Sequence, residues 1–453
     1  MHQHGENLTK WRHYLQNITS PDIYIDVGFY FMIAAALQRR VFTSAIEKPV
    51  WPNLYVILVG PPSVGKGAVI NPIIKCLKYH KRKIIDPKTD AIFASAVKVN
   101  EGMSGARVDL NKIPRTSYIE NLFHSAPDCT TFEGVVRFHA DALRLLNLDE
   151  EFAEHGKDYV EALKIKYARI LQAGRYPHSS IHFALEEMSS LFRKNTEDVV
   201  NYLVKSFDGE NYDYRPKTEA LQDLVVLPVL NFLAGTQPSF LSGAFDDKLV
   251  GEGFCARTIF TYADKKRFVK FNMLEDSITE AQIKSKDEIV EHLGKLGHLF
   301  GQVGWEPGAH EFLRYYIEEE LPRKRANYHP KLEYYYGRKD VISTKLSMAV
   351  HFADSLEMKI NMRDCEIALE ILEEVEKRMH LALTFKGQNP LAEIGKNVVE
   401  WLEKSGPKTY TEILEQFYAD LRVIQLNEVI AFLVSTDKIR SEKIHGDMMY
   451  RKL

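Results

Sequence analysis

The residues of this chain whose types and spacing best suit chemistry form the pattern Gly-x-x-x-x-Gly-Lys. Gly60 and Gly65 bound a short loop, and Lys66 follows it directly. Backbone N–H groups of such a loop can surround an anion, and the lysine can reach the β- and γ-phosphates of a nucleotide. The alternative is a chance glycine-rich turn. A strand pattern before the loop and a helix pattern after it favour the phosphate site. The residues predicted to surround the phosphates are Gly60, Pro61, Pro62, Ser63, Val64, Gly65, Lys66, Gly67 and Ala68.

The position after the lysine departs from this pattern. A Ser or Thr normally stands there, and its hydroxyl binds Mg²⁺. This chain has Gly67 followed by Ala68, so the hydroxyl ligand is missing. We therefore expect Mg²⁺ to depend more on another side chain and on water, with slow turnover as one consequence.

A pair of carboxylates can supply that side chain. The apolar run Ile181–Leu185 ends in Glu186 and Glu187, which is the order of a Walker B strand. Glu186 would hold Mg²⁺ directly or through water, and Glu187 would polarise the attacking water as general base. An ordinary strand end with acidic residues is the alternative. The upstream glycine loop favours the catalytic interpretation.

Two later strand patterns also end or begin at candidate residues. The run Val225–Ala234 leads into Gly235-Thr236-Gln237-Pro238, where Thr236 or Gln237 can contact the γ-phosphate or the attacking water. Arg257 directly precedes the strand pattern Thr258–Tyr262. An arginine at such an edge of a nucleotide domain can serve a neighbouring subunit. A surface salt bridge is the alternative.

These residues must be positioned by a parallel sheet. Tyr55–Val59 is an unbroken apolar run with β-branched residues, as expected of a strand buried on both faces. Together with the runs that end at Leu185, Ala234 and Tyr262, it predicts an α/β core. We divide the chain into a helical N-terminal region (1–50), an ATPase core with insertions (51–270), a helical lid (271–388) and a winged helix (389–453).

The last two regions rest on helix patterns. Glu280–Phe385 is expected to be all-helical. Beyond it, helix patterns over Ala392–Lys404, Thr411–Phe417 and Leu426–Val434 precede two short strand patterns around Gly446. That order is typical of a winged helix.

The composition limits the classes of protein to which this chain can belong. The chain has 453 residues, 45% of them hydrophobic and 27% charged, which is ordinary for a globular protein of two or three domains. The net charge of −3 does not imply nucleic-acid binding, although a single face can still be basic. No signal-peptide pattern and no membrane-spanning apolar run is present, so we expect a cytoplasmic protein without a membrane partner. Zinc or redox spacing is absent among Cys76, Cys129, Cys255 and Cys365, which fits a reducing compartment.

The motifs, taken in this order, resemble phage and mobile-element primase-helicase ATPases of the AAA+ class. This family is often described only as a domain of unknown function. The resemblance covers roughly Thr9–His380 by its repeated buried strands with polar ends. Its most specific elements are Gly235-Thr236-Gln237-Pro238 and the Asp208-Gly209 element with the following Arg215. The fold that it implies is a P-loop AAA+-like parallel-sheet core with a helical N-terminal layer, a helical lid and a C-terminal winged helix.

The resemblance also implies roles for single residues. Lys66 would be the Walker A lysine, and Glu186 and Glu187 the Walker B pair. Thr236 or Gln237 would be sensor 1, and Arg257 the arginine finger. Sensor 2 would be Arg338 or Lys345, acting from the lid, and the sequence leaves that choice open. The implied cofactors are ATP and Mg²⁺, and the implied partners are DNA and further copies of the chain in a hexameric ring.

The chain departs from the family in three respects besides Gly67. The first acidic residue of the Walker B pair is Glu rather than Asp. Two insertions, near Lys88–Tyr118 and Asn147–His178, lengthen the core. The glycine loop begins so early that we expect no primase domain before it.

Three functions are compatible with this sequence. The first is an ATP-dependent oligomeric DNA helicase or translocase of phage or mobile-element replication. The alternative is an ATP-switched DNA-binding module, such as a helicase loader, origin binder or defence sensor, with weak hydrolysis; Gly67 favours it. The third, a nucleotide kinase, is disfavoured because the helical carboxyl half and the winged helix offer no evident phosphoryl acceptor site.

Overall fold

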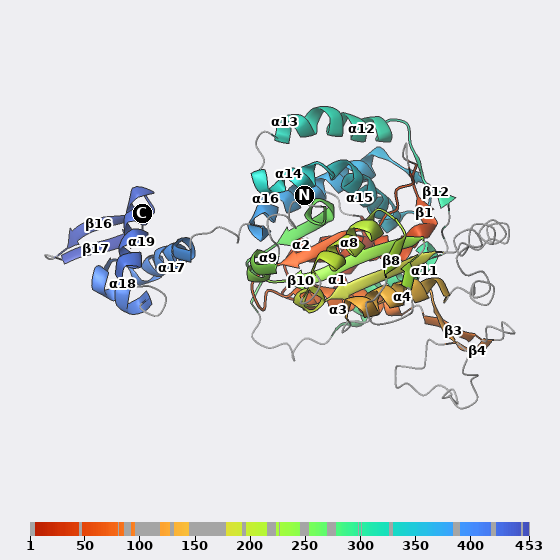
Figure 1. Cartoon of the computed structure of the whole chain (residues 1–453), viewed down its shortest axis with the longest axis horizontal. Coiled ribbons are helices and arrows are strands. Elements are labelled where there is room, and N and C mark those ends of the chain that lie inside the picture. Colours follow the sequence, from red (N-terminus) through yellow and green to blue (C-terminus); the bar gives the residue numbers. More distant parts are fainter. Residues whose placement is uncertain are drawn as a thin grey trace. The chain divides into compact units, whose positions relative to one another are not determined.

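The chain folds into two compact units, Met1–Leu383 and Thr384–Leu453. In this computed structural model (Figure 1) the described residues are 5–44, 48–79, 81–85, 92–95, 118–126, 131–144, 178–192, 196–214, 223–225, 227–244, 253–269, 278–297, 299, 301–325, 329–383, 390–417, 423–444 and 447–452. Most of the two predicted insertions lies outside these residues, as do Arg215, Gly446 and the predicted boundaries at 270 and 388. The first unit contains one continuous hydrophobic core, which runs from Leu8 to Ala382.

A five-stranded parallel sheet lies at the centre of the described part of the first unit. Its strands, in spatial order, are β11 (Thr258–Tyr262), β2 (Tyr55–Val59), β10 (Pro228–Thr236), β7 (Ser179–Leu185) and β6 (His124–Ser125). All four pairings between neighbours are parallel. The prediction of a mixed α/β fold with a parallel sheet is therefore confirmed.

The register aligns the carboxyl ends of the three central strands. Thr236 of β10 is opposite Val59 of β2, and Ala234 is opposite Leu185 of β7. The segments that leave β2, β7 and β10 therefore begin at the same edge of the sheet.

Helices cover both faces of this sheet. On one face α2 (Asp22–Leu37) packs on α3 (Lys66–Lys78) so closely that a Cβ on Gly28 would lie 2.9 Å from side-chain carbons of Val69 and Ile73. On the other face, the Tyr55 hydroxyl donates to the Leu203 carbonyl of α8 (Thr196–Phe207) at 2.6 Å. Further helices that contact these layers include α1 (Glu6–Tyr14), α4 (Phe132–Arg144) and α11 (Glu280–Leu296).

The third predicted region, 271–388, is mainly but not entirely helical. Its later helices are α12 (Ala309–Tyr315), α13 (Leu321–Arg325), α14 (Glu333–Tyr336), α15 (Lys339–Asp354) and α16 (Met362–Ala382). The expectation of an all-helical region is wrong because β12 (Gly301–Gln302), β13 (Gly304–Trp305) and β14 (Lys359–Ile360) interrupt it. Two-residue strands leave no periodic pattern in a sequence. One of them, β12, pairs with β1 (Val41–Phe42) and so ties this region to the N-terminal segment.

One predicted strand is divided in two. The run Val225–Ala234 belongs partly to β9 (Asp223–Val225), which forms a hairpin with β8 (Tyr212–Tyr214), and partly to β10. Between them Leu227 has a φ of 50°, a conformation that ends an extended segment. The other short elements are β3 (Lys81–Ile85), β4 (Ile92–Ser95), β5 (Tyr118–Asn121), α7 (Ser189–Phe192) and α9 (Pro238–Ala244), of which β3, β4 and β5 form a separate antiparallel sheet.

The second unit has its own small core. Its elements are α17 (Pro390–Ser405), β15 (Lys408–Thr409), α18 (Tyr410–Phe417), α19 (Val423–Ser435), β16 (Ile439–Ile444) and β17 (Asp447–Lys452). The three helices and two strands expected from the sequence are thus present, with β15 as a third strand beside β17. In the part of the chain that the structure describes, no helix has both the length and the apolar character needed to span a membrane.

Four of the buried histidines of the first unit lie beside the β6–β7 edge of the sheet. Burial lowers the pKa of His124 and of His139 to about 4 and that of His182 to about 3, and it lowers the pKa of His178 as well. The His139 ring lies between the Ser179 carbonyl (2.6 Å) and the Tyr202 hydroxyl (2.7 Å). Because a carbonyl only accepts, Nε2 donates to it, and Nδ1 accepts from Tyr202.

These histidines predict that acid destabilises the fold. The unfolded chain binds protons near pH 6.5, whereas the folded chain excludes them down to about pH 4. The free energy of unfolding should therefore be fully retained above pH 6.5 and fall as the pH drops from 6.5 toward 4. Urea unfolding at a series of pH values measures this slope. His182→Phe should flatten it, and substitution of the exposed His310 by Asn should not. An unchanged free energy of unfolding between pH 7 and 5 would contradict the assignment.

Candidate nucleotide-phosphate site

The glycine loop, residues Gly60–Lys66, connects the carboxyl end of β2 to the amino end of α3. Its first residue donates its N–H to the Thr236 carbonyl (3.2 Å), and the Ser20 hydroxyl donates to the Gly65 carbonyl (2.6 Å). Between these anchors Ser63 is exposed. The loop is therefore fixed at both ends and open between them, beside the positive end of the α3 dipole.

Both glycines of the loop stand where a side chain has no room. A Cβ on Gly60 would lie 2.3 Å from the Ala263 carbonyl oxygen, and one on Gly65 would lie 2.6 Å from the Ser20 hydroxyl oxygen. Gly65 has a φ of 102°, and Ser63 has a φ of 64°. Positive φ is costly for residues with a side chain, and such strain gathers at ligand-binding loops. The loop geometry therefore supports a binding role.

Lys66 lies folded across the loop. Its Nζ donates to the carbonyl oxygens of Gly60 (2.7 Å) and Pro61 (3.0 Å). Burial lowers the pKa of Lys66, and the charge of Glu187 opposes this effect. Neutral carbonyls accept more weakly than an ionised phosphate, so phosphate oxygens can replace them as partners of the ammonium.

The carboxylate pair lies at the same edge of the sheet. Glu186 and Glu187 follow β7 directly, and both are exposed. The next N–H, of Met188, donates to the Gly235 carbonyl at the end of β10 (2.8 Å). A Cβ on Gly235 would lie 2.4 Å from the Glu186 carbonyl oxygen and 3.3 Å from Cβ of Lys66. The structure thus brings Lys66 and the Glu186 backbone together around Gly235, with the charge of Glu187 close enough to act on Lys66.

The two candidates after Gly235 differ in their surroundings. Side chains alternate along a strand, and the Gly235 position faces Lys66, so Thr236 faces away from it. Thr236 is fully buried, whereas Gln237 is partly exposed. Of the two residues that the sequence leaves open, the geometry favours Gln237.

Two residues of the N-terminal region, Ser20 and Tyr24, help to hold the glycine loop in place. The Tyr24 hydroxyl of α2 donates to the Val59 carbonyl (2.6 Å) and accepts from the Ala263 N–H (3.2 Å). Together with the Ser20 contact, it holds the ends of β2 and β11 beside the loop. Ser20 and Tyr24 were not predicted as site residues. Tyr24 could have been identified from the sequence as a tyrosine inside an otherwise apolar helix, because a buried hydroxyl requires a hydrogen-bond partner.

Arg257 lies at the other end of the sheet. It precedes β11, an edge strand, so the length of that strand, about 15 Å, separates it from the carboxyl edge. Its side chain is 7% exposed and forms two hydrogen bonds with Asp208 Oδ2, from Nη2 (2.5 Å) and Nε (3.2 Å). Arg257 is therefore neither exposed toward a neighbouring subunit nor part of a surface salt bridge. A role between subunits requires the pair with Asp208 to open.

Both sensor 2 candidates belong to the same end as Arg257. Lys345 is buried, and its Nζ donates to the Asn53 side-chain oxygen (2.5 Å) and the Trp51 carbonyl (2.9 Å). Burial lowers the pKa of Lys345 to about 7. Nη1 of Arg338 lies 3.8 Å from Asp208 Oδ1. Lys345 thus lies near the start of β2 and Arg338 beside Asp208, so these positions do not support a contact with the nucleotide, and the sensor 2 role stays a prediction.

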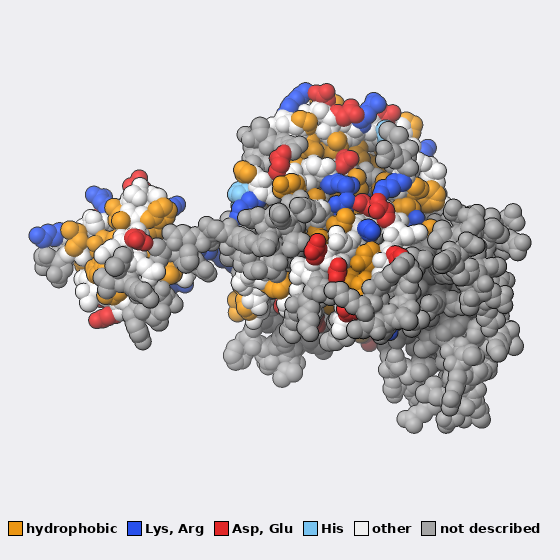
Figure 2. Space-filling model, viewed as in Figure 1, with side chains coloured by type: hydrophobic (Ala, Val, Ile, Leu, Met, Phe, Trp, Pro, Cys, Tyr) orange, Lys and Arg blue, Asp and Glu red, His pale blue; other side chains and the backbone are white. Residues whose placement is uncertain are grey.

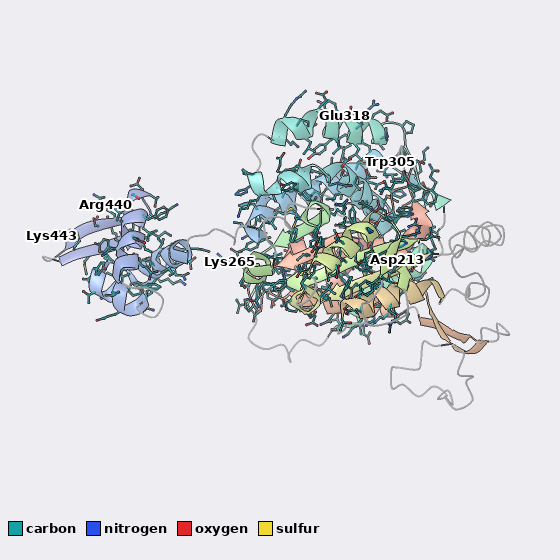
Figure 3. The ribbon with its side chains drawn as sticks, viewed as in Figure 1. Asp213, Lys265, Trp305, Glu318, Arg440 and Lys443 are labelled. Carbon is teal, nitrogen blue, oxygen red and sulfur yellow. The ribbon has the colours of Figure 1, made fainter. Side chains whose placement is uncertain are left out.

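A different cation of the helical region lies at the carboxyl edge. Arg378 of α16 forms an ion pair with Asp264 (2.7 Å) and lies over the Tyr262 ring at 5.3 Å. Tyr262 is the last residue of β11, and Asp264 follows two residues later. Ala263, between them, contacts Gly60. Lys265, labelled in Figure 3, is exposed one residue further on. No motif marks Arg378 in the sequence, so only the fold reveals it as the better-placed cation.

The carboxylate oxygens at the carboxyl edge of the sheet are suitable ligands for Mg²⁺. Among the described residues no group of three or more His, Cys, Asp or Glu side chains is placed to hold a metal ion. Mg²⁺ in nucleotide sites, however, needs only one or two carboxylates together with phosphate oxygens and water. The exposed carboxylate of Glu186, which lies over the first turn of α3, meets that requirement.

No protein-family model matches the sequence, and no curated protein matches it either. What supports a nucleotide site is therefore the geometry of the chain itself.

The buried pair predicts the effect of removing Arg257. Arg257→Ala leaves the Asp208 carboxylate buried without its main partner, which typically costs about 3–5 kcal/mol. Urea unfolding measures the loss. Arg338→Ala is the matched control, because this partly exposed arginine at 3.8 Å should contribute only about 0–1 kcal/mol. Equal, small effects of both substitutions would show that Arg257 is not held as described.

Proposed function

We propose that this protein is a P-loop ATPase of AAA+-like architecture that works as an oligomeric DNA helicase or translocase in phage or mobile-element replication. The observation that carries the proposal is that Lys66 and the segment Glu186–Glu187 lie at the same end of β10, beside Gly235. A glycine loop, a carboxylate pair and a polar strand end at one edge of a parallel sheet are the parts that ATP hydrolysis needs.

The proposed reaction is attack of water on the γ-phosphate of ATP. Lys66 would leave the carbonyls of Gly60 and Pro61 to neutralise phosphate charge, and Gln237 would orient the water or the γ-phosphate. Glu187 would accept the proton of that water. Mg²⁺, held by Glu186 and water, would supply charge stabilisation to the phosphates. Arg378 is the cation of the helical region best placed to join them.

An oligomer is proposed because Arg257 lies too far from the loop of its own subunit. Head-to-tail packing in a ring, expected to be hexameric, would bring that edge to the phosphates of the next subunit. Release of Arg257 from Asp208 would then accompany assembly.

DNA binding is proposed for the second unit as a winged helix. Exposed cations lie on β16, on β17 and in the turn before β16, as well as on α17, and Arg440 and Lys443 are labelled in Figure 3. Helix α19, in contrast, contains no Lys or Arg. On the visible face of Figure 2 basic side chains of this unit are scattered among apolar and acidic ones. We therefore expect contacts from the strands to DNA phosphates, with little base reading by α19. The exposed cations of the strands and of the turn before β16 are Lys438, Arg440, Lys443, Arg451 and Lys452, and those of α17 are Lys396 and Lys404.

The second candidate is an ATP-switched DNA-binding module that hydrolyses slowly. Gly67 favours it, because the metal loses a hydroxyl ligand, and so does the burial of Arg257. The two functions differ in how DNA affects ATP hydrolysis. Only a motor must couple ATP hydrolysis to movement along DNA.

Phosphate release from ATP, with and without single-stranded DNA, tests the proposal. We expect DNA to raise the rate in the wild type. Lys66→Ala should abolish hydrolysis and weaken ATP binding, because the loop loses its own cation. Lys75→Ala, an exposed lysine further along α3, should behave as the wild type. Full activity of Lys66→Ala would refute the loop assignment. ATP binding without any DNA effect would favour the switched module.

Glu187→Gln should separate binding from turnover. The amide can still contact the water but cannot accept its proton, so ATP binding should persist while hydrolysis falls about a hundredfold to ten-thousandfold. Titration with a fluorescent ATP analogue and single-turnover hydrolysis measure the two quantities. Glu197→Gln, an exposed glutamate of α8, serves as the control. If Glu187→Gln stays active and Glu186→Gln does not, the two roles are reversed.

A further inference from the structure

The carboxylate of Glu186 occupies the space above Gly67. A Cβ on Gly67 would lie 3.0 Å from Glu186 Oε2 and 3.2 Å from its carboxylate carbon. Gly67 is the position where a P-loop normally carries the hydroxyl that binds Mg²⁺. The missing side chain and the long carboxylate therefore fit each other in space.

Asn71 determines where that carboxylate lies. It is four residues after Gly67, so it projects from the same side of α3 one turn further on. Its Nδ2 donates to Glu186 Oε1 at 2.6 Å. One carboxylate oxygen is thus bound by the amide, and the other is the atom nearest to a Cβ on Gly67.

This contact matters because Glu186 is exposed. An exposed glutamate has many rotamers, and holding it in one of them costs conformational entropy. A charge-assisted hydrogen bond from Asn71 offsets part of that cost before the metal arrives. Hydrogen-bond partners of this kind commonly orient the side chains that bind a metal ion.

We infer that Gly67, Asn71 and Glu186 form one coupled magnesium-binding unit, in which Asn71 is the positioning residue and Glu186 replaces the absent hydroxyl. This inference rests on the proposed function, since the metal arrives with the nucleotide. Its distinctive consequence is that Gly67 and Glu186 cannot be changed independently. A shorter carboxylate withdraws the oxygen from above Gly67, and a side chain at position 67 displaces that oxygen.

The test is the Mg²⁺ dependence of nucleotide binding. A fluorescent ATP analogue is titrated with Mg²⁺, and the concentration that gives half of the metal-induced gain in affinity is measured. Asn71→Leu removes the hydrogen bond at similar size, and it should raise that concentration about tenfold. Binding of the analogue without metal should not change. Lys75→Ala on the same helix is the control.

A double-mutant cycle tests the coupling. Gly67→Ser alone and Glu186→Asp alone should each raise the Mg²⁺ requirement. The double substitution should lower it again, toward the wild-type value, because a hydroxyl and a short carboxylate together restore the usual pair of ligands.

The outcomes distinguish this inference from the proposed function. Wild-type protein that binds no analogue at any Mg²⁺ concentration overturns both. Wild-type protein that binds with a clear Mg²⁺ dependence, while Asn71→Leu matches it or the two other substitutions act additively, overturns the coupled unit alone. A raised requirement in Asn71→Leu together with recovery in the double variant supports it.

Discussion

Parallel hydrogen bonding of β10 to β2 on one side and to β7 on the other is the constraint on which the candidate site depends. Because the three strands run in the same direction, the glycine loop, the carboxylate pair and Gln237 all begin at one edge. Register matters as much as direction. A slip of one residue would move a side chain of β10 into the place of Gly235, against Lys66 and the Glu186 backbone.

The two ends of this sheet differ in their electrostatics. At the amino end Asp208 and Arg257 are enclosed, and Lys345 is surrounded by carbonyl and amide oxygens. Such groups are satisfied within the fold and hold it together. At the carboxyl end the carboxylates are exposed, and Lys66 is bound only by loop carbonyls. Groups of this second kind can exchange their partners for a ligand as they stand, whereas Arg257 can do so only if its pair with Asp208 opens.

The sequence predicts some elements closely because their signals are local. Tyr55–Val59 and Thr258–Tyr262 are found as predicted, since each is a continuous apolar run in a buried strand. The edge strand β6 has only two residues and no such run. The burial of Arg257 depends on Asp208, 49 residues away in the chain, which no local pattern reveals. The role of Asn71 could have been predicted from the sequence, because Asn71 lies one helical turn after Gly67.

The central claim is that the glycine loop holds nucleotide phosphates, and hydrogen–deuterium exchange tests it most directly. Exchange of the backbone amides from Gly60 to Gly67 is compared with and without a non-hydrolysable ATP analogue and Mg²⁺. The account predicts slower exchange there, because these N–H groups would donate to phosphate oxygens. It also predicts that Lys66→Ala loses most of this protection. Unchanged exchange in the loop, under conditions in which the analogue is bound, would contradict the account.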